Sequence, residues 1–419
     1  MADFSSPAGV PAPRGRWLAL APFLALEMVI TMFAFSVGVM LPDIRADLGI
    51  SAVQAGWLGA AFFFSHAFLS LPYALLFGRA SPRRALTVMG LSSGALIIAQ
   101  GLASTFLPLV ALRYLSTAAI VGRRATLALL LFQWFPVHAL VQVNSLVTAL
   151  HALGQVLAMA ATPALLATLG GWRPVLFLLG SLMLAATVAW VALGRDRVTP
   201  EYVARFRAQR GAPLGVVLRH SWIWTMAGCQ VGSALAWAAF VTFWPTFALE
   251  NRHLSLASVG LLMGLFPLGS LTGSLAAGPL SGWLGRRKPL VWASGFGMAL
   301  SYTGLVLVAA PPALAALLFI TGFFSFLVIP PLQALPYEKD RLTPQEITVA
   351  ISLMSTLTPL GAAAGPLLAG AIAQASGSLF AGLVAAIPGC LTLALGGLLL
   401  PETGDVAART QPRPAGTAH

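Results

Sequence analysis

Long runs of apolar residues, separated by short polar breaks, follow one another along nearly the whole chain. A helix of about 20 apolar residues crosses the roughly 30 Å hydrocarbon core of a bilayer. The runs lack the strict alternation of β-barrel strands, and backbone amides in lipid must pair within their own segment, so each run predicts a membrane-spanning α-helix. We predict twelve spans, near residues 17–41, 55–77, 85–104, 107–131, 140–166, 174–193, 221–247, 257–280, 289–309, 313–331, 347–373 and 378–400.

The polar breaks divide these spans into two sets of six. The longest basic segment, residues 194–220, separates the sixth span from the seventh and predicts a cytoplasmic central loop. We therefore predict an all-α integral membrane protein with two six-helix bundles, at 17–193 and 221–400. The Pro- and Ala-rich tails, 1–16 and 401–419, are expected to lie outside the bundles in the cytoplasm.

The composition excludes a water-soluble protein, because 58% of the residues are hydrophobic and only 9% are charged, with a mean hydropathy of +0.86. The first apolar run is too long for a signal-peptide core, so it is interpreted as a retained span. Cys229 and Cys390 lie in predicted spans without partner spacing. They indicate neither a disulfide framework nor a metal site, and no cofactor is expected.

The net charge of +12 raises the possibility of a nucleic-acid partner, but the distribution of the charge argues against it. Of the 24 basic residues, 18 fall in alternate breaks and in the tails. This asymmetry follows the positive-inside rule and predicts that both termini are cytoplasmic. We expect a multi-pass protein of the plasma membrane, which is the inner membrane of a bacterium. Its expected surroundings are the lipid bilayer, and no nucleic-acid partner is expected.

The second half of the chain repeats features of the first at an offset of about 204 residues, as internal repeats of membrane carriers do. The matched pairs are Gly78 with Gly282, Ser81 with Gly285, Arg83 with Arg287, Arg84 with Lys288, Ser51 with Ser255 and Gly56 with Gly260. Pro163 and Pro366, which predict kinks in spans five and eleven, are 203 positions apart. The two bundles are therefore predicted to be pseudo-symmetric.

At this point the chain resembles the major facilitator superfamily of secondary transporters, over about 17–400. The family loop G-x-x-x-D-R-x-G-x-R-R corresponds to residues 74–84, and its second copy to 278–287. The stretches "GGWRPVLFLLG", "LPYEKDRLTPQE", "GAAAGPLLAG" and "LPETG" are also similar to the family. The resemblance implies a central cavity lined chiefly by spans one, four, seven and ten, and alternating access by rocking of the two halves.

The same resemblance assigns gating roles to the two copies of the loop. The residues concerned are Gly78, Arg79, Arg83 and Arg84 in the first copy, and Gly282, Gly285, Arg286 and Arg287 in the second. In the family an acidic residue of this loop helps to latch the outward-facing state. Gly78 and Gly282 stand at the positions of that acid.

Glu27 is the one acidic residue, of twelve, that the sequence places inside a predicted span and away from its ends. A lone carboxylate in mid-bilayer costs about 2.5–3.5 kcal/mol, so it needs a partner, a proton or a function. The functional interpretation is a proton-coupling or substrate-contacting group, with Thr31 on the same helix face one turn away. The alternative is a fixed structural ion pair with an arginine.

Three arginines, Arg113, Arg123 and Arg124, lie in predicted span four. On a continuous helix Arg113 and Arg124 differ in direction by only about 20°, so they are expected to share a face. Glu27 is expected at nearly the same depth in the membrane as Arg123 and Arg124, which predicts that it contacts Arg124 or Arg123. Arg113 also falls where many family members carry an arginine. The alternatives are helix packing for Arg113, and snorkelling of Arg123 and Arg124 to the headgroups.

Three guanidinium groups against one carboxylate would make the chamber cationic, and arginine forks select planar anions. This favours a small carboxylate-like cargo bound by Arg113, Arg123 and Arg124. Side chains expected to line the same chamber are Thr31, Gln230, Trp237, Thr321 and Ser325, for which helix packing is the alternative. His66 and His151 are candidate proton relays, with a buried structural histidine as the alternative.

The cytoplasmic segments show no phosphate-binding loop, metal-ligand cluster or nucleophile with a base, so neither an ATP-driven pump nor an enzyme is expected. We predict a monomeric secondary transporter, proton-coupled, for a small organic anion. A proton-driven efflux antiporter for drugs or metabolites is the first alternative, and a non-transporting receptor on the same fold is the second. The direction of transport stays open.

Overall fold

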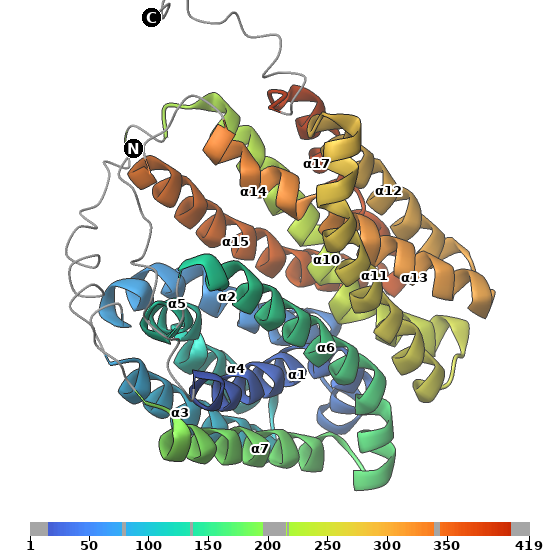
Figure 1. Cartoon of the computed structure of the whole chain (residues 1–419). Helices are drawn as coiled ribbons and strands as arrows, with labels where there is room; N and C mark the ends of the chain where they lie inside the picture. Colours follow the sequence, from blue (N-terminus) through green and yellow to red (C-terminus); the bar gives the residue numbers. More distant parts are fainter. Residues whose placement is uncertain are drawn as a thin grey trace, which may run out of the picture.

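The computed structural model describes residues 16–77, 81–134, 137–195, 215, 218–338 and 344–403, which are almost entirely helical. The helices of the first half are α1 (Arg16–Leu48), α2 (Ala52–Phe77), α3 (Pro82–Gly101), α4 (Phe106–Ile120), α5 (Arg123–Trp134), α6 (Val137–Leu169) and α7 (Trp172–Leu193). Those of the second half are α10 (Ser221–Arg252), α11 (Leu256–Leu284), α12 (Lys288–Leu307), α13 (Pro311–Leu327), α14 (Ile329–Glu338), α15 (Pro344–Ser376), α16 (Leu379–Ala386) and α17 (Pro388–Leu399). Figure 1 shows them as two bundles, α1–α7 and α10–α17, packed side by side.

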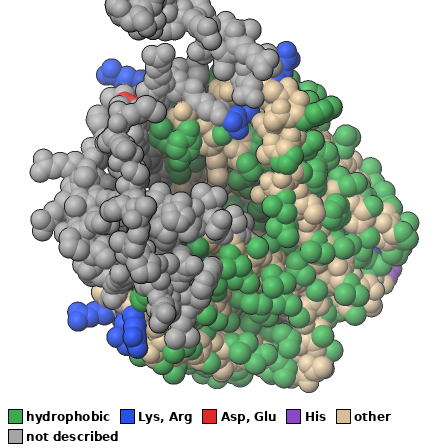
Figure 2. All heavy atoms as spheres, viewed as in Figure 1, with side chains coloured by type: hydrophobic (Ala, Val, Ile, Leu, Met, Phe, Trp, Pro, Cys, Tyr) green, Lys and Arg blue, Asp and Glu red, His purple; other side chains and the backbone are tan. Residues whose placement is uncertain are grey.

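The described helices have the length and composition of membrane spans. Ten helical stretches in this part of the chain are long and apolar enough to cross a bilayer. Large apolar side chains remain on the outside, among them Leu102, Leu275 and Leu399, which are 73%, 69% and 78% exposed. Figure 2 shows hydrophobic side chains over most of the described surface on this face. An exposed apolar surface of this kind is favourable in contact with lipid and unfavourable in contact with water.

Every predicted span coincides with a helix or with a pair of helices, but three spans are not continuous. Span four, predicted at 107–131, ends as α4 and restarts as α5 after a turn at Val121 and Gly122. Span ten is interrupted at Val328, just ahead of Pro330. Span twelve is interrupted at Ile387, so that Pro388 begins α17. Hydropathy does not change across these points, whereas glycine weakens a helix and proline is tolerated only in its first turn.

The repeat predicted from the sequence builds the contact between the two bundles. A Cβ at Gly56 of α2 would meet the carbonyl oxygen of Pro366 on α15, and one at Gly260 of α11 would meet the ring of Pro163 on α6. These two contacts are copies of each other under the offset of about 204 residues. Gly38 of α1 packs against the α10 backbone in the same manner. The missing side chains let the helices approach closely, as membrane helix pairs commonly require.

We call the end of the bundles at which α1 begins the inner end, and the end at which α1 finishes the outer end. The charge pattern predicts that the inner end is cytoplasmic. Arg45 and Glu250 form an ion pair of 3.0 Å between α1 and α10 at the outer end. The backbone N–H of Val53 donates to Gln374 Oε1 at 3.3 Å, also between the bundles. In this structure the outer end is therefore closed.

Candidate functional site

A buried ion pair joins α1 to α5. Arg123 Nε donates to Glu27 Oε1 at 2.9 Å, and the two residues are 2% and 4% exposed. Arg123 can reach Glu27 because the turn at Gly122 restarts the helix at Arg123 itself. One of the two contacts predicted for Glu27 is thus present, whereas the continuous helix that placed Arg113 and Arg124 on one face is wrong. The side chain of Arg124 lies outside the described residues.

Two histidines extend this ion pair into a polar cluster of Glu27, Thr31, His66, Arg123, His151 and Gln155. His66 Nε2 lies 3.3 Å from Arg123 Nη1, and His66 Nδ1 lies 2.9 Å from the carbonyl oxygen of Phe62. A carbonyl only accepts and a guanidinium only donates, so these contacts fit a neutral imidazole with its proton on Nδ1. The cluster thus contains one ion pair and a histidine whose Nε2 accepts from the same arginine.

His151 is held on the other side of the same cluster. Its Nδ1 lies 2.9 Å from Thr31 Oγ1, and Gln155 Nε2 lies 3.2 Å from its Nε2. The Thr31 hydroxyl also contacts the Glu27 carbonyl oxygen at 2.8 Å. Both predicted histidines therefore sit beside Glu27, one through Arg123 and one through Thr31.

Arg113 lies elsewhere and has no carboxylate partner among the described residues. It is 2% exposed, and its Nε donates to Leu58 O at 2.9 Å and its Nη2 to Ala34 O at 3.2 Å. Its guanidinium carbon stands 5.0 Å from the centre of the Phe33 ring. Nη1 is buried and has no hydrogen-bond partner within the described chain. Arg113 thus keeps both its charge and one free donor.

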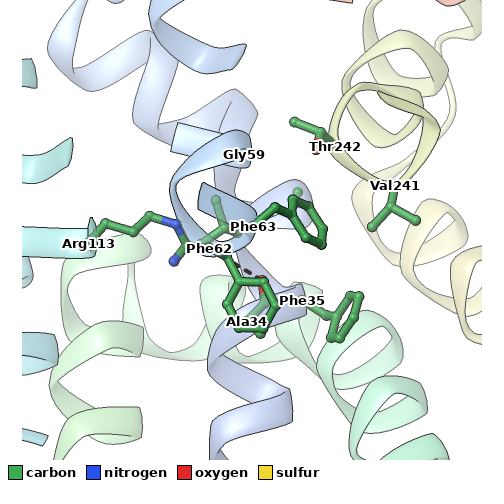
Figure 3. Close-up of a pocket in the computed structure, with 10 residues that line it drawn as sticks. Ala34, Phe35, Gly59, Phe62, Phe63, Arg113, Val241 and Thr242 are labelled. Atoms are coloured by element: carbon green, nitrogen blue, oxygen red, sulfur yellow. Dashed lines mark hydrogen bonds between the residues drawn. The ribbon is translucent and has the colours of Figure 1, made fainter. Parts of the chain in front are cut away.

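Nη1 belongs to a group that lines a pocket between the bundles. We call this hollow the aromatic pocket; it is lined by Ala34, Phe35, Val37, Gly38, Gly59, Phe62, Phe63, Arg113, Val241 and Thr242. Figure 3 shows Arg113 entering from one side, while Phe35 and Phe63 point toward Val241 and Thr242 of α10. The pocket therefore combines one cation with a mainly apolar, aromatic wall.

The aromatic pocket lies outward of the polar cluster. Glu27 precedes Phe35 by eight residues, so it lies about 12 Å nearer the inner end of α1. At the level of Phe35 the bundles touch, since the Trp237 ring of α10 lies 6.0 Å from the Phe35 ring. The inter-bundle contacts described above all lie at this level or farther outward. The polar cluster thus lies on the inner side of the closed contact.

The other residues predicted to bind substrate are dispersed. Gln230 accepts a hydrogen bond of 2.8 Å from the Thr358 hydroxyl on α15. Thr321 lines a second, smaller hollow inside the C-terminal bundle, and Ser325 donates to the Thr321 carbonyl at 2.7 Å. Of the predicted set only Arg113 lines the aromatic pocket, with Trp237 beside it.

The predicted gating residues are partly described. Gly78 and Arg79 lie outside the described residues. Arg83 Nη2 donates to Val191 O at 2.7 Å, and the backbone N–H of Arg84 donates to Ser81 Oγ, the cap of α3. The Arg83 contact ties the start of α3 to the end of α7, and the Arg84 contact caps α3 locally.

In the second copy of the loop, Gly282 and Arg286 are exposed. Gly285 ends α11 with a positive φ of 59°, a conformation that favours glycine. The backbone N–H of Arg287 donates to Glu402 Oε1 at 2.7 Å. This copy thus forms the turn between α11 and α12, with a carboxylate at the start of α12.

Several residues of the site escaped the sequence analysis. Gln155 completes the polar cluster, and Phe35, Phe62 and Phe63 form most of the pocket wall. The run of three phenylalanines from Phe62 ahead of His66 was a usable signal, because it marks an aromatic face next to an ionisable group. Nothing local distinguished Gln155 from other polar residues in membrane helices.

Comparisons with known proteins agree on one family. The sequence model of the Major Facilitator Superfamily matches residues 23–339 and, in an overlapping match, residues 226–419. A probable sulfoacetate transporter, SauU, of Cupriavidus necator is 24% identical over 326 residues, which are 72% of this chain and 75% of that protein. A chloramphenicol resistance protein of Streptomyces lividans is 29% identical over 348 residues, which are 80% of this chain and 84% of that protein.

A solved structure shares the fold at low sequence identity. A bacterial homologue of the human lysosomal transporter Spinster, in an inward-facing and occupied conformation, superposes with a TM-score of 0.76 at 13% identity. The superposition covers 96% of this chain and 100% of that chain.

Proposed function

Because the chain belongs to the major facilitator superfamily of membrane transporters, we propose that it moves a small organic anion by alternating access, coupled to protons. Family and fold are those of a multi-pass transporter. The cargo class and the coupling ion are the proposal. The inner membrane of a bacterium, with both chain termini in the cytoplasm, remains the expected location.

The observation that carries the anion proposal is the charge left over on Arg113. Within the described membrane interior, Glu27 is balanced by Arg123, whereas Arg113 donates only to backbone carbonyls and so has no counter-charge there. A buried guanidinium is costly in a membrane unless a function retains it. An anion that enters the aromatic pocket would supply the missing charge. The sulfoacetate named for one relative is such an anion, which supports the proposal.

Glu27 is the proposed proton carrier. It is buried, it lies on the inner side of the closed contact, and its only charged partner within the described chain is Arg123. A proton on Glu27 would cancel the ion pair and free Arg123 to move with α5. His66 Nε2 accepts from Arg123 in this structure, so it could take that proton only once Arg123 has moved away.

The test is flux through proteoliposomes that contain the purified protein, with radiolabelled sulfoacetate as the probe. Glu27→Gln keeps an oxygen that accepts from Arg123 but removes the charge that a proton would neutralise. We expect it to abolish accumulation driven by a pH gradient and to spare counterflow exchange. Asp47→Asn, which alters an acid 41% exposed whose ion pair with Arg173 lies within the N-terminal bundle, is the matched control and is expected to retain both. Equal loss of both activities in Glu27→Gln would make the ion pair structural.

An efflux antiporter for neutral amphipathic compounds is the second candidate. The similarity to a chloramphenicol resistance protein and the aromatic wall of the pocket favour it. Expression in a chloramphenicol-sensitive host separates the two candidates. Resistance conferred without any flux of sulfoacetate would favour efflux, and it would overturn the anion proposal.

A further inference from the structure

Arg113 has no counter-charge and one unpaired donor, and it lines a very small cavity. Its side chain is buried, and Nη1 has no hydrogen-bond partner in the part of the chain that the structure describes. Figure 3 shows it at the aromatic pocket, with Phe35 and Phe63 of its own bundle and with Val241 and Thr242 of α10. A charged group inside a membrane protein is costly, so whatever faces Arg113 in this cavity determines its role.

Within the described chain, the groups around Arg113 do not supply the missing negative charge. Glu27, the buried acid of the same bundle, pairs with Arg123 and lies about 12 Å inward of Phe35. The Phe33 ring, 5.0 Å from the guanidinium carbon, attracts the cation through its face but carries no net charge. Arginine does not lose its proton in proteins, so it cannot avoid the cost by becoming neutral. A mobile anion would supply the charge.

The volume of the cavity limits which anion fits. It is about 20 Å³, and a single water molecule needs about 10–15 Å³ by the same measure. A chloride ion is only slightly larger than a water molecule, whereas an organic anion such as sulfoacetate is several times larger. Water would accept from Nη1 but would leave the charge uncompensated. In this conformation the cavity therefore suits one monatomic anion.

The wall of the cavity favours such an ion. Among the described residues that line it, only Arg113 and Thr242 have polar side chains. An apolar wall excludes water, and the attraction between a guanidinium and an anion is stronger in such surroundings. Thr242 Oγ1 lies only 2.8 Å from the position that a Cβ on Gly59, another lining residue, would take. Its hydroxyl can donate, so it is compatible with a neighbouring anion.

We propose that Arg113 Nη1 binds a chloride ion in the aromatic pocket while the outer end is closed. The ion is the counter-charge of the buried arginine. This inference goes beyond the proposed function, because the chloride ion belongs to the closed conformation and is not the cargo. An organic anion can reach Arg113 only after the bundles separate, so cargo and chloride exclude each other at this arginine.

Bromide tests the position of the ion, because it resembles chloride in size and charge and can be located by its anomalous scattering. Crystals of the full-length protein grown in bromide are expected to show an anomalous peak in contact with Arg113 Nη1. A density peak there without an anomalous signal would be water and would contradict the proposal. The absence of any peak at Nη1 would contradict it as well.

Stability in detergent tests the same site in solution. Gluconate is too large for the cavity, and we expect its replacement by chloride at constant ionic strength to raise the unfolding temperature by a few degrees, because a ligand of the folded state stabilises that state. Arg113→Gln removes the charge and should lose this response. Arg173→Gln is the matched control, because it removes an arginine of the same bundle that is 35% exposed. It should respond to chloride as the unaltered protein does.

The outcomes separate this inference from the proposed function. A chloride response that persists in a folded Arg113→Gln variant would overturn the chloride site, while sulfoacetate flux would still support the anion carrier. A bromide ion at Nη1 together with no sulfoacetate flux would support the chloride site and contradict the carrier. If Arg113→Gln does not fold, the position of bromide in the unaltered protein decides.

Discussion

Arg113 and Arg123 are both buried in the N-terminal bundle, and their partners distinguish their roles. Arg123 donates to a carboxylate, so its charge is neutralised within the protein. Arg113 donates to two backbone carbonyls, which satisfy hydrogen bonds but leave a full positive charge. Arg113 is suited to attract an anion, because its charge is uncompensated and its Nη1 has no hydrogen-bond partner in the described chain. Arg123 is suited to respond when Glu27 changes its charge.

Also at the residue scale, the ion pair between Glu27 and Arg123 leads to a prediction about stability. Arg123→Ala leaves the Glu27 carboxylate buried without its cation, a change that costs about 3–5 kcal/mol in buried pairs. We expect a clear drop in the unfolding temperature, followed by tryptophan fluorescence in detergent. Glu27→Gln should cost less, because its amide oxygen still accepts from Arg123. In the double variant Glu27→Gln/Arg123→Ala, part of the loss should be recovered. A loss equal to the sum of the two single variants would mean that the residues are not coupled.

At the scale of the element, interruptions in the helices position the site. Gly122 separates α4 from α5, and the restart of the helix places Arg123 toward Glu27. The close approach of whole helices is the second feature that positions the site. At Gly56 the absence of a side chain lets α2 lie directly on the backbone of α15, whereas a Cβ at Gly228 of α10 would meet open space.

These two glycines predict opposite effects of one substitution. Alanine is favoured over glycine inside a helix by about 0.5–1 kcal/mol, so Gly228→Ala is expected to raise the unfolding temperature. Gly56→Ala gains the same helix propensity but forces α2 away from Pro366. We therefore expect the unfolding temperature to fall. Differential scanning fluorimetry of both variants in one detergent makes the comparison. A rise for both would show that the bundle contact tolerates a methyl group.

At the scale of the whole molecule, the two bundles meet through contacts concentrated toward one end. Arg45 with Glu250, and Val53 with Gln374, join the bundles at the outer end. Alternating access requires this end to open. A covalent link there should stop transport, whereas a link within one bundle should not.

A pair of cross-linking experiments tests this motion in a Cys229→Ala/Cys390→Ala background. Arg45→Cys/Glu250→Cys joins α1 to α10 when treated with a short reducible bifunctional reagent. We expect sulfoacetate counterflow to stop and to return on reduction. Asp47→Cys/Arg173→Cys is the control, because Asp47 of α1 and Arg173 of α7 form an ion pair within the N-terminal bundle. Its cross-link should leave counterflow intact. Continued exchange through the cross-linked Arg45/Glu250 pair would contradict rocking of rigid bundles.

Much of the architecture was predictable, because hydropathy and the repeat are properties of the chain order. The repeat pairs Gly56 with Gly260 and Pro163 with Pro366, and the structure uses these residues in reciprocal contacts between the bundles. The interruptions at Val328 and Ile387 were missed although Pro330 and Pro388 follow directly. An apolar run conceals a break, because the residues on both sides of it are equally soluble in lipid.

For the candidate site, the sequence indicated some of the residues involved but not how they are arranged. Glu27, His66, Arg123 and His151 stood out because ionisable groups are rare in membrane helices, and the structure brings these four together. Thr321 and Ser325 are not joined to them by any contact found in the described chain. Small polar residues also serve helix packing, so their presence in a span does not indicate which way they face.

The sequence by itself determined the class of the protein, its two homologous halves and its family, since these follow from composition and from the order of residues along the chain. Tertiary structure alone decided that Arg123 pairs with Glu27, that Arg113 has no counter-charge in the described chain, and that Trp237 lies beside the aromatic pocket. The physical reason lies in the direction that each side chain takes around its helix. Neighbouring residues on a helix point about 100° apart, so one turn at Gly122 decides which side chains meet.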